Sequence, residues 1–180
     1  MNLIIKEHKS ASYAPRTYHN ASQGVTLAIA VDFTTAGEKL THKAANGKIV
    51  QIEWFNTWDK LYPARALYSA LKKHNCHVVN VAGNGIYTLA KHGVTQAQAN
   101  QYVYTILKLV HHHWPITQIV SGGQTGMDIA GLVAGVALGI ETIGTWPKGY
   151  KMRFEDGKDV DMSEEWIHNY IVTQVAELEK

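Results

Sequence analysis

The chain has 180 residues, of which 46% are hydrophobic and 18% charged, and its formal net charge is +2 at pH 7. This length and composition are typical of an ordinary globular domain. The small net charge makes nucleic acid an unlikely partner, because a general polyanion binder carries a clear basic excess. Cys76 is the only cysteine, which excludes an internal disulfide and a cysteine-cluster metal site.

The first residues, "MNLIIKEHKS", contain only a short apolar run, and no apolar run of membrane-spanning length follows. We therefore expect no signal peptide and no membrane partner, and we predict a cytoplasmic protein, in the host cytoplasm if the chain is phage-encoded. Residues 1–24 lack a clear periodicity and are predicted to form an irregular N-terminal extension. An edge strand and an oligomer contact are the alternatives that the sequence leaves open for them.

Apolar runs with the length and β-branched content of strands follow one another along the chain. They cover residues 25–31, 48–54, 77–82, 116–121 and 141–146. Helical patterns lie between and after them, over residues 63–74, 96–113 and 124–138 and from about Ser163 onward. Thr95 and Gln98 have the spacing of a capping box at the start of the second of these helices.

The alternation of strands and helices predicts an α/β fold, a Rossmann-like three-layer sandwich with a mostly parallel central sheet and residues 25–180 in a single domain. In such a sheet, ligands bind beyond the carboxyl ends of the strands. Glycine, amide, hydroxyl and basic side chains gather at these ends and suit a phosphorylated ligand. They are Thr34, Thr35, Gly83, Asn84, Gly85, Ser121, Gly122, Gly123, Gln124, Thr125, Gly126, Lys148, Gly149 and Arg153.

The densest of these groups is "SGGQTGMD", residues 121–128. Its glycines let backbone N–H groups point into a cavity, and the helix expected to begin near Gln124 favours an anion at its N-terminus. A phosphate is therefore expected on this turn. Tight packing of strand against helix is the alternative explanation of the glycines, and Asp128 is either a ribose ligand or simply an acid in a first helical turn.

The stretch "SGGQTGMDIAGLVAGVALGI", followed by "PKG" at 147–149, resembles the SLOG superfamily of Rossmann-like nucleotide-binding proteins, and most of all its branch of molybdenum-cofactor carriers. "NVAGNGIYTL" (80–89) and "RFEDGKDV" (153–160) extend the resemblance, which is specific over about residues 78–160. It implies a phosphate-bearing ligand at residues 122–126 and Asp128. It also implies that Lys148 and Gly149 close the opposite wall of the site.

The catalytic string P-G-G-x-G-T-x-x-E of the cytokinin-activating phosphoribohydrolases in this superfamily does not occur in the chain. Their activity therefore does not carry over. If an N-glycosidic bond is cut here, Glu38, Asp128 and Asp159 are the candidate catalytic carboxylates. A capped helix that begins near Gly37, with Thr34 or Thr35 as the cap, is the favoured explanation of Glu38.

Trp146 and Tyr87 lie near the glycine loops and can either stack on a base or belong to the core, and Trp146 is predicted to line the pocket. We predict that Trp54, Trp58 and Trp166 are packing residues. No metal site is predicted, because the adjacent histidines at 111–113 point about 100° apart around a helix and cannot all face one ion.

We therefore expect the chain to bind a nucleotide or nucleotide-derived small molecule through a glycine-rich phosphate loop, as a sensor, carrier or sequestering protein without a certain cofactor. SLOG relatives sense NAD-derived or cyclic nucleotide signals in antiphage defence, so the resemblance implies sequestration of such a signal, a phage anti-defence role, as one use. A nucleotide or nucleoside N-glycosidase and a molybdenum-cofactor carrier are the alternatives. A homo-oligomer, dimer or larger, is also expected.

Overall fold

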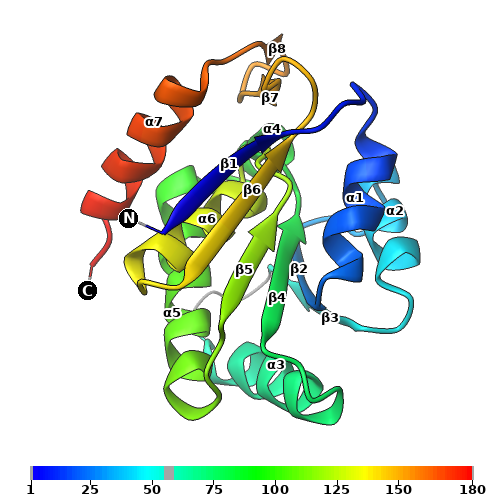
Figure 1. The fold of residues 1–180 in the computed structure, drawn as a ribbon, viewed down its shortest axis with the longest axis vertical. Helices are drawn as coiled ribbons and strands as arrows, with labels where there is room; N and C mark the ends of the chain where they lie inside the picture. The colour runs from blue at the N-terminus through cyan, green and yellow to red at the C-terminus, as the bar shows by residue number, and fades with distance from the viewer. Residues whose placement is uncertain (1, 55–58, 180) are drawn as a thin grey trace.

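The structure is a computed structural model that describes residues 2–54 and 59–179. Its centre is a six-stranded parallel sheet in the order β1-β6-β5-β4-β2-β3 (Figure 1). The strands are β1 (Leu3–Glu7), β2 (Val25–Ala30), β3 (Ile49–Glu53), β4 (Val78–Gly83), β5 (Gln118–Ser121) and β6 (Glu141–Trp146). Helices cover both faces, so the prediction of a Rossmann-like α/β sandwich is confirmed.

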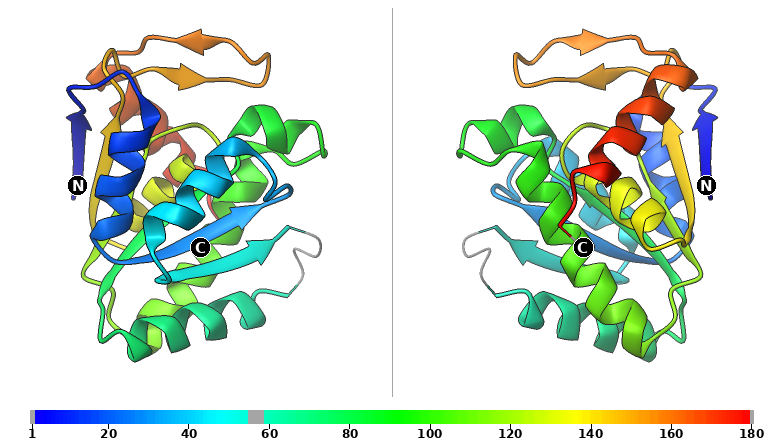
Figure 2. Two further views of the ribbon diagram at one scale, coloured as in Figure 1. Left: turned by 90° about the vertical axis from the view of Figure 1, so that its right-hand side faces the viewer. Right: turned by 90° about the vertical axis from the view of Figure 1, so that its left-hand side faces the viewer.

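The two helical layers are unequal in size (Figure 2). One layer holds α1 (Tyr13–Ser22) and α2 (Ala36–Ala45), and the other holds α3 (Leu61–Lys73), α5 (Gln96–His113), α6 (Met127–Ala137) and α7 (Glu164–Ala176). The short helix α4 (Ile86–Ala90) and the antiparallel pair β7 (Met152–Arg153) and β8 (Asp159–Val160) lie near the carboxyl ends of the strands. Within the described ranges, no helix is long and apolar enough to cross a membrane.

The central strands and α6 form the most deeply buried part of the molecule. Every residue of β2 is buried, as expected for a parallel strand that is covered on both faces. Helix α6 is apolar almost all round and lies against β4, β5 and β6. A Cβ atom at Gly131 would lie only 2.5 Å from Cβ of Val81, so the absence of a side chain at Gly131 lets this helix approach the sheet closely.

The long predicted elements are present, with small shifts at their ends. Helix α5 spans residues 96–113 as predicted, and its capping box is confirmed by a 2.9 Å hydrogen bond from Thr95 N to Gln98 Oε1 and by the reciprocal bond to Thr95 Oγ1. Helix α6 begins at Met127 rather than near Gln124, because its N-cap is Gly126 with a φ of +90°. The elements α4, β7 and β8 have too few residues for a periodic signal, and the sequence did not predict them.

The prediction of an irregular extension over residues 1–24 is wrong for most of these residues. Leu3–Glu7 forms the edge strand β1, parallel to β6, so the edge-strand alternative describes this part. Helix α1 packs against α2 in the smaller helical layer. Its periodicity was missed because its buried residues are Arg16, Asn20 and Ala21, which give no large apolar stripe.

Two of the tryptophans that were predicted to pack do so. The ring of Trp54 lies edge-on to that of Tyr102, with 4.8 Å between the ring centroids. Trp166 stacks on Tyr170 at 4.9 Å, although 38% of its surface remains exposed. Trp58 lies outside the described residues.

Candidate functional site

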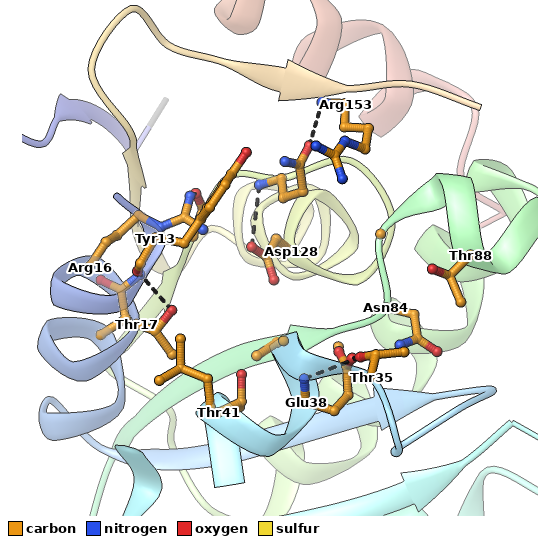
Figure 3. A pocket seen from close by; sticks show the side chains of 18 of the residues that line it. Tyr13, Arg16, Thr17, Thr35, Glu38, Thr41, Asn84, Thr88, Asp128 and Arg153 are labelled. Atoms are coloured by element: carbon orange, nitrogen blue, oxygen red, sulfur yellow. Dashed lines mark hydrogen bonds between the residues drawn. The ribbon is translucent and has the colours of Figure 1, made fainter. Parts of the chain in front are cut away.

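The connections that follow β2 and β4 leave the sheet toward opposite faces. Strand β2 leads into α2 in one helical layer, and β4 leads through α4 into α5 in the other. Because β2 and β4 are neighbours, a crevice opens between their carboxyl ends, at the topological switch point where sheets of this kind bind ligands. A pocket of about 250 Å³ lies at this point (Figure 3).

The pocket walls come from segments that are far apart in the sequence: helix α1, the start of α2, the end of β4 with the loop after it, and the glycine turn with β7. Part of the predicted site is present, namely Thr35, Glu38, Gly83, Asn84, Gly85, Gly122, Gln124, Asp128 and Arg153. The remaining lining residues are Tyr13, Arg16, Thr17, Asn20, Gly37, Leu40, Thr41, Asn80, Ala82, Tyr87 and Thr88.

Asn84 fixes the floor of the pocket by joining the ends of β2 and β4. Its Oδ1 accepts hydrogen bonds from the backbone N–H groups of Val31 and Asp32, at 2.8 and 3.0 Å, and its Nδ2 donates to Asp32 O at 3.1 Å. The neighbouring Gly83 has a φ of +151°, and a Cβ there would overlap the carbonyl of Ile29. These two residues therefore hold the switch point together as well as lining it.

The amides of residues 124–126 in the glycine turn already have partners within the protein. Gln124 N donates to Asp128 Oδ2 at 3.3 Å, Thr125 N to Gln124 Oε1 at 3.0 Å, and Gly126 N to Gln96 Oε1 at 2.6 Å. The carboxylate of Asp128 thus sits near the helix N-terminus, where a phosphate was expected. A phosphate at that N-terminus would have to compete with an internal acid.

Two glycines of the turn are explained by tight packing. Gly123 has a φ of +73°, and a Cβ there would overlap the indole ring of Trp146. A Cβ at Gly126 would overlap the backbone of the loop that follows β4. Trp146 is itself fully buried and does not line the pocket, so the prediction that it covers a base is wrong for this site.

Tyr13 and Tyr87 are the aromatic residues that do line the pocket. Tyr87 is 37% exposed, and Lys91 Nζ lies 3.8 Å from the centroid of its ring. Tyr13, on α1, has Arg16 Cζ 5.1 Å from the centroid of its ring. A flat ligand group could therefore contact either of these two rings.

The predicted basic wall is only partly present. Lys148 is exposed and does not line the pocket, and Gly149 N donates to Glu7 Oε1 at 2.7 Å on the far side of the β6 end. Arg153 lines the pocket, but its guanidinium is bound to both carboxylate oxygens of Asp159, at 2.8 and 3.0 Å. Asp159 therefore belongs to the β7–β8 hairpin and not to the pocket, which removes it as a catalytic candidate.

Of the predicted hydroxyl donors, Thr35 lines the pocket and the other three bond to groups of the surrounding loops and strands. Ser121 Oγ donates to Val81 O at 2.7 Å, Thr125 Oγ1 donates to a backbone carbonyl of β7, and Thr34 Oγ1 donates to Asp32 Oδ1 at 2.6 Å. None of these three threonine and serine residues lines the pocket. Their hydroxyls support the loops around it.

Two acids, Glu38 and Asp128, face the pocket from opposite helical layers (Figure 3). The hydroxyl of Thr35 donates to Glu38 Oε2, and its oxygen caps α2 by accepting from Glu38 N. Burial raises the pKa of Glu38 to about 7, and the negative charge of Asp128 contributes to this rise. Burial raises the pKa of Asp128 to about 6, against the opposing effect of the Arg16 charge.

Arg16 is the main site residue that sequence reasoning missed. It is 5% exposed, and its Nη1 donates to the backbone carbonyls of Gly122 and Thr145. Burial lowers the pKa of its guanidinium, and the charge of Asp128 raises it. A signal was present in the sequence, because the polar residues at 13, 16, 17 and 20 have the spacing of one helical face.

The described residues contain no group of three or more His, Cys, Asp or Glu side chains placed to hold a metal ion. The three adjacent histidines form the last turn of α5. There His111 Nδ1 accepts a hydrogen bond from Ile116 N at 3.0 Å. The structure thus places these histidines at the end of a helix.

Comparison of the chain with protein-family models, with curated proteins and with solved structures found no match. A Rossmann-like sheet is present, but this fold supports many functions and does not identify one. The resemblance to the SLOG superfamily therefore stays a prediction that rests on the residues quoted for it.

Proposed function

We propose that the pocket binds a nucleotide or a nucleotide-derived small molecule, for sensing, carriage or sequestration. The observation that carries this proposal is the set of groups at the switch point. The buried Arg16 offers positive charge to an anionic group, the carboxyl groups of Glu38 and Asp128 can accept from ribose hydroxyls, and Tyr13 and Tyr87 can contact a base. A volume of about 250 Å³ is just below the usual range of about 300–1,000 Å³ for ligand pockets, which limits the enclosed part of the ligand to a mononucleotide or one half of a dinucleotide.

The proposal is tested by thermal unfolding with AMP, NAD, ADP-ribose and cyclic dinucleotides. A ligand at a hundred times its dissociation constant stabilises the fold by about 2.7 kcal/mol. Tyr87→Ala is expected to lower the affinity for the most stabilising nucleotide by about tenfold or more, since stacking on a base contributes about 1–3 kcal/mol. Tyr62→Ala, at a tyrosine that is 64% exposed outside this pocket, is the matched control and should behave as the wild type. No stabilisation by any of these nucleotides would contradict the proposal.

A second candidate function, hydrolysis of an N-glycosidic bond, is favoured by the pairing of Glu38 with Asp128. One protonated carboxyl group gives its proton to the leaving base as the C–N bond breaks, and the other carboxylate stabilises the positive charge that develops on the sugar. Water then attacks the anomeric carbon and gives a proton to a carboxylate of the pair, which restores the starting state. Carboxyl groups with raised pKa values in one pocket are typical of catalytic acids.

Mass spectrometry of the same nucleotide mixtures distinguishes the two functions. Hydrolysis predicts free base and the corresponding sugar phosphate with the wild type, and loss of this product with Glu38→Gln and with Asp128→Asn while binding persists. Full recovery of intact nucleotide after long incubation with the wild type would exclude hydrolysis and leave the binding function in place.

A further inference from the structure

Arg16 is a buried cation whose hydrogen-bonding capacity is only partly used by the protein. Its Nη1 is directed at the carbonyls of Gly122 and Thr145, whereas its Nε has no hydrogen-bond partner among the described residues. An unpaired buried donor costs about 1–3 kcal/mol, and more when the group is charged. The site would therefore be stabilised by a ligand that accepts from this guanidinium.

No acid of the described chain makes a direct ion pair with Arg16. None of the ion pairs within 4.0 Å among these residues includes it, and Asp128 acts on it only through longer-range attraction. Arg153, the other arginine of the pocket, already has both oxygens of Asp159 against its guanidinium. Arg16 is thus the arginine of the pocket that can take a new anion without giving up an ion pair.

Gly122 lets the side chains of Arg16 and Asp128 lie close against the backbone of the glycine turn. A Cβ atom there would lie 2.5 Å from Asp128 Oδ2, 3.0 Å from Arg16 Cζ and 3.1 Å from Arg16 Nη2. The φ angle of Gly122 is not in the left-handed region, unlike that of Gly123. The backbone conformation therefore does not require glycine at this position, but the two pocket side chains around it do.

We infer that Arg16 binds the oxyanion of the ligand, a phosphate monoester in a nucleotide, through the Nε–Nη2 edge of its guanidinium beside Gly122. This inference rests on the proposed function and names the part of the pocket that takes the negative charge. The two parallel N–H groups of this edge match two oxygens of one phosphate. The bonds from Nη1 to the backbone hold the plane of the guanidinium in place.

The experiment compares AMP with adenosine and inorganic phosphate by isothermal titration calorimetry on the wild type, Arg16→Met, Arg16→Lys and Arg65→Met. Arg65→Met is the matched control, because Arg65 is exposed on α3 and does not line this pocket. We expect the wild type and Arg65→Met to bind AMP about 10–100-fold more tightly than adenosine, the range that charge-assisted hydrogen bonds supply. Arg16→Met should reduce this preference to less than about threefold with little change for adenosine, and Arg16→Lys should fall between them.

A retained preference for AMP in Arg16→Met would overturn the inference while the proposed function stands. If Arg16→Met does not fold, Arg16→Lys provides the test, because lysine keeps the positive charge but lacks the planar edge of the guanidinium. A preference for AMP over adenosine in Arg16→Lys as large as in the wild type would then overturn the inference. If no nucleotide binds but inorganic phosphate binds the wild type and not the Arg16 variants, the oxyanion site stands and the proposed function fails. If neither AMP nor phosphate binds the wild type, the inference is overturned as well.

Discussion

Within the pocket, the ionisation of Glu38 is opposed by three features of its surroundings. The carboxyl group is buried, Asp128 faces it from α6, and Asp32 adds a further negative charge. Hydrogen bonds from its own backbone N–H and from Asn84 favour the ionised form but do not outweigh burial. The protein therefore carries an acid that is poised to change its protonation near neutral pH.

Glu38→Gln is expected to stabilise the protein at pH 8 and to do so less at pH 5. Folding raises the pKa of Glu38 from an ordinary value of 4.5 to about 7, so this residue does not reduce the stability below about pH 4.5 and reduces it increasingly as pH rises toward 7. The loss amounts to about 3 kcal/mol at most, and glutamine, which does not titrate, avoids it.

Urea unfolding of both proteins at pH 5 and pH 8 measures this difference. Glu165→Gln, at an exposed acid of α7, is the control and should follow the wild type at both pH values. An equal effect of Glu38→Gln at pH 5 and pH 8 would show that Glu38 is not held near neutrality.

Gly123→Ala is expected to lower the free energy of unfolding by about 2–4 kcal/mol, because alanine would be forced into a positive φ and into the ring of Trp146. Gly37→Ala is the matched control. Its new Cβ would meet nothing nearer than 3.9 Å in the first turn of α2, so a gain of up to about 1 kcal/mol is expected. Chemical denaturation of the two variants would contradict this account if both had the same effect.

The sequence predicts individual site residues well where they follow a strand and poorly elsewhere. Asn84 and Gly122 follow apolar runs closely, Asp128 lies in the first turn of the helix after the second run, and the strand-end rule brings them together. Arg16 lies on a helix whose buried face is polar, so no hydrophobic pattern identifies it. Trp146 was misplaced because a strand-end position does not say whether a ring points into the pocket or beneath the glycine turn.

At the scale of elements, the close approach of α6 to the sheet sets where the N-terminus of this helix meets the pocket. Gly131 faces Val81 of β4, and Gly135 faces β6, where a Cβ would overlap Thr142 Oγ1. The small residues on this helix therefore determine the depth of the pocket wall that carries Asp128.

Gly131→Ala is expected to destabilise the protein by about 1–3 kcal/mol, because the new Cβ is forced against Val81. This loss outweighs the advantage of about 1 kcal/mol that alanine has over glycine in a helix. Val81→Ala removes the methyl groups that the new Cβ would contact. The double variant should therefore be more stable, by about 1 kcal/mol or more, than the sum of the two single effects predicts. Residues in contact typically show a coupling of about 0.5–3 kcal/mol. Denaturation of the four proteins in this cycle measures the coupling, and additive effects would contradict the packing described for α6.

Elements were predictable in proportion to their length and apolar pattern. Helix α5 combines eighteen residues with a capping box, and its bounds follow from the sequence. Strand β1 has only five residues, partly exposed at the edge of the sheet, and its place beside β6 depends on pairing with a segment more than a hundred residues away. Such long-range pairing leaves no local signal in the sequence.

At the scale of the whole molecule, the pocket is built from both ends of the chain. Helix α1 supplies Arg16 from a region where the SLOG resemblance is weak, and α2 supplies Glu38 from the same region. The glycine turn and the β7–β8 hairpin come from the region where the resemblance is specific. The N-terminal segment is therefore part of the site, and its removal would open one wall of the pocket.

The most direct test of the central claim, that the switch-point pocket is the nucleotide site, is a backbone amide NMR titration with AMP and with ADP-ribose. The account predicts chemical-shift changes concentrated in four segments, namely residues 13–20, 35–41, 82–88 and 122–128, that saturate together as one site fills. Changes concentrated on another surface, such as the α3 face around Arg65, or no changes with either nucleotide, would contradict it.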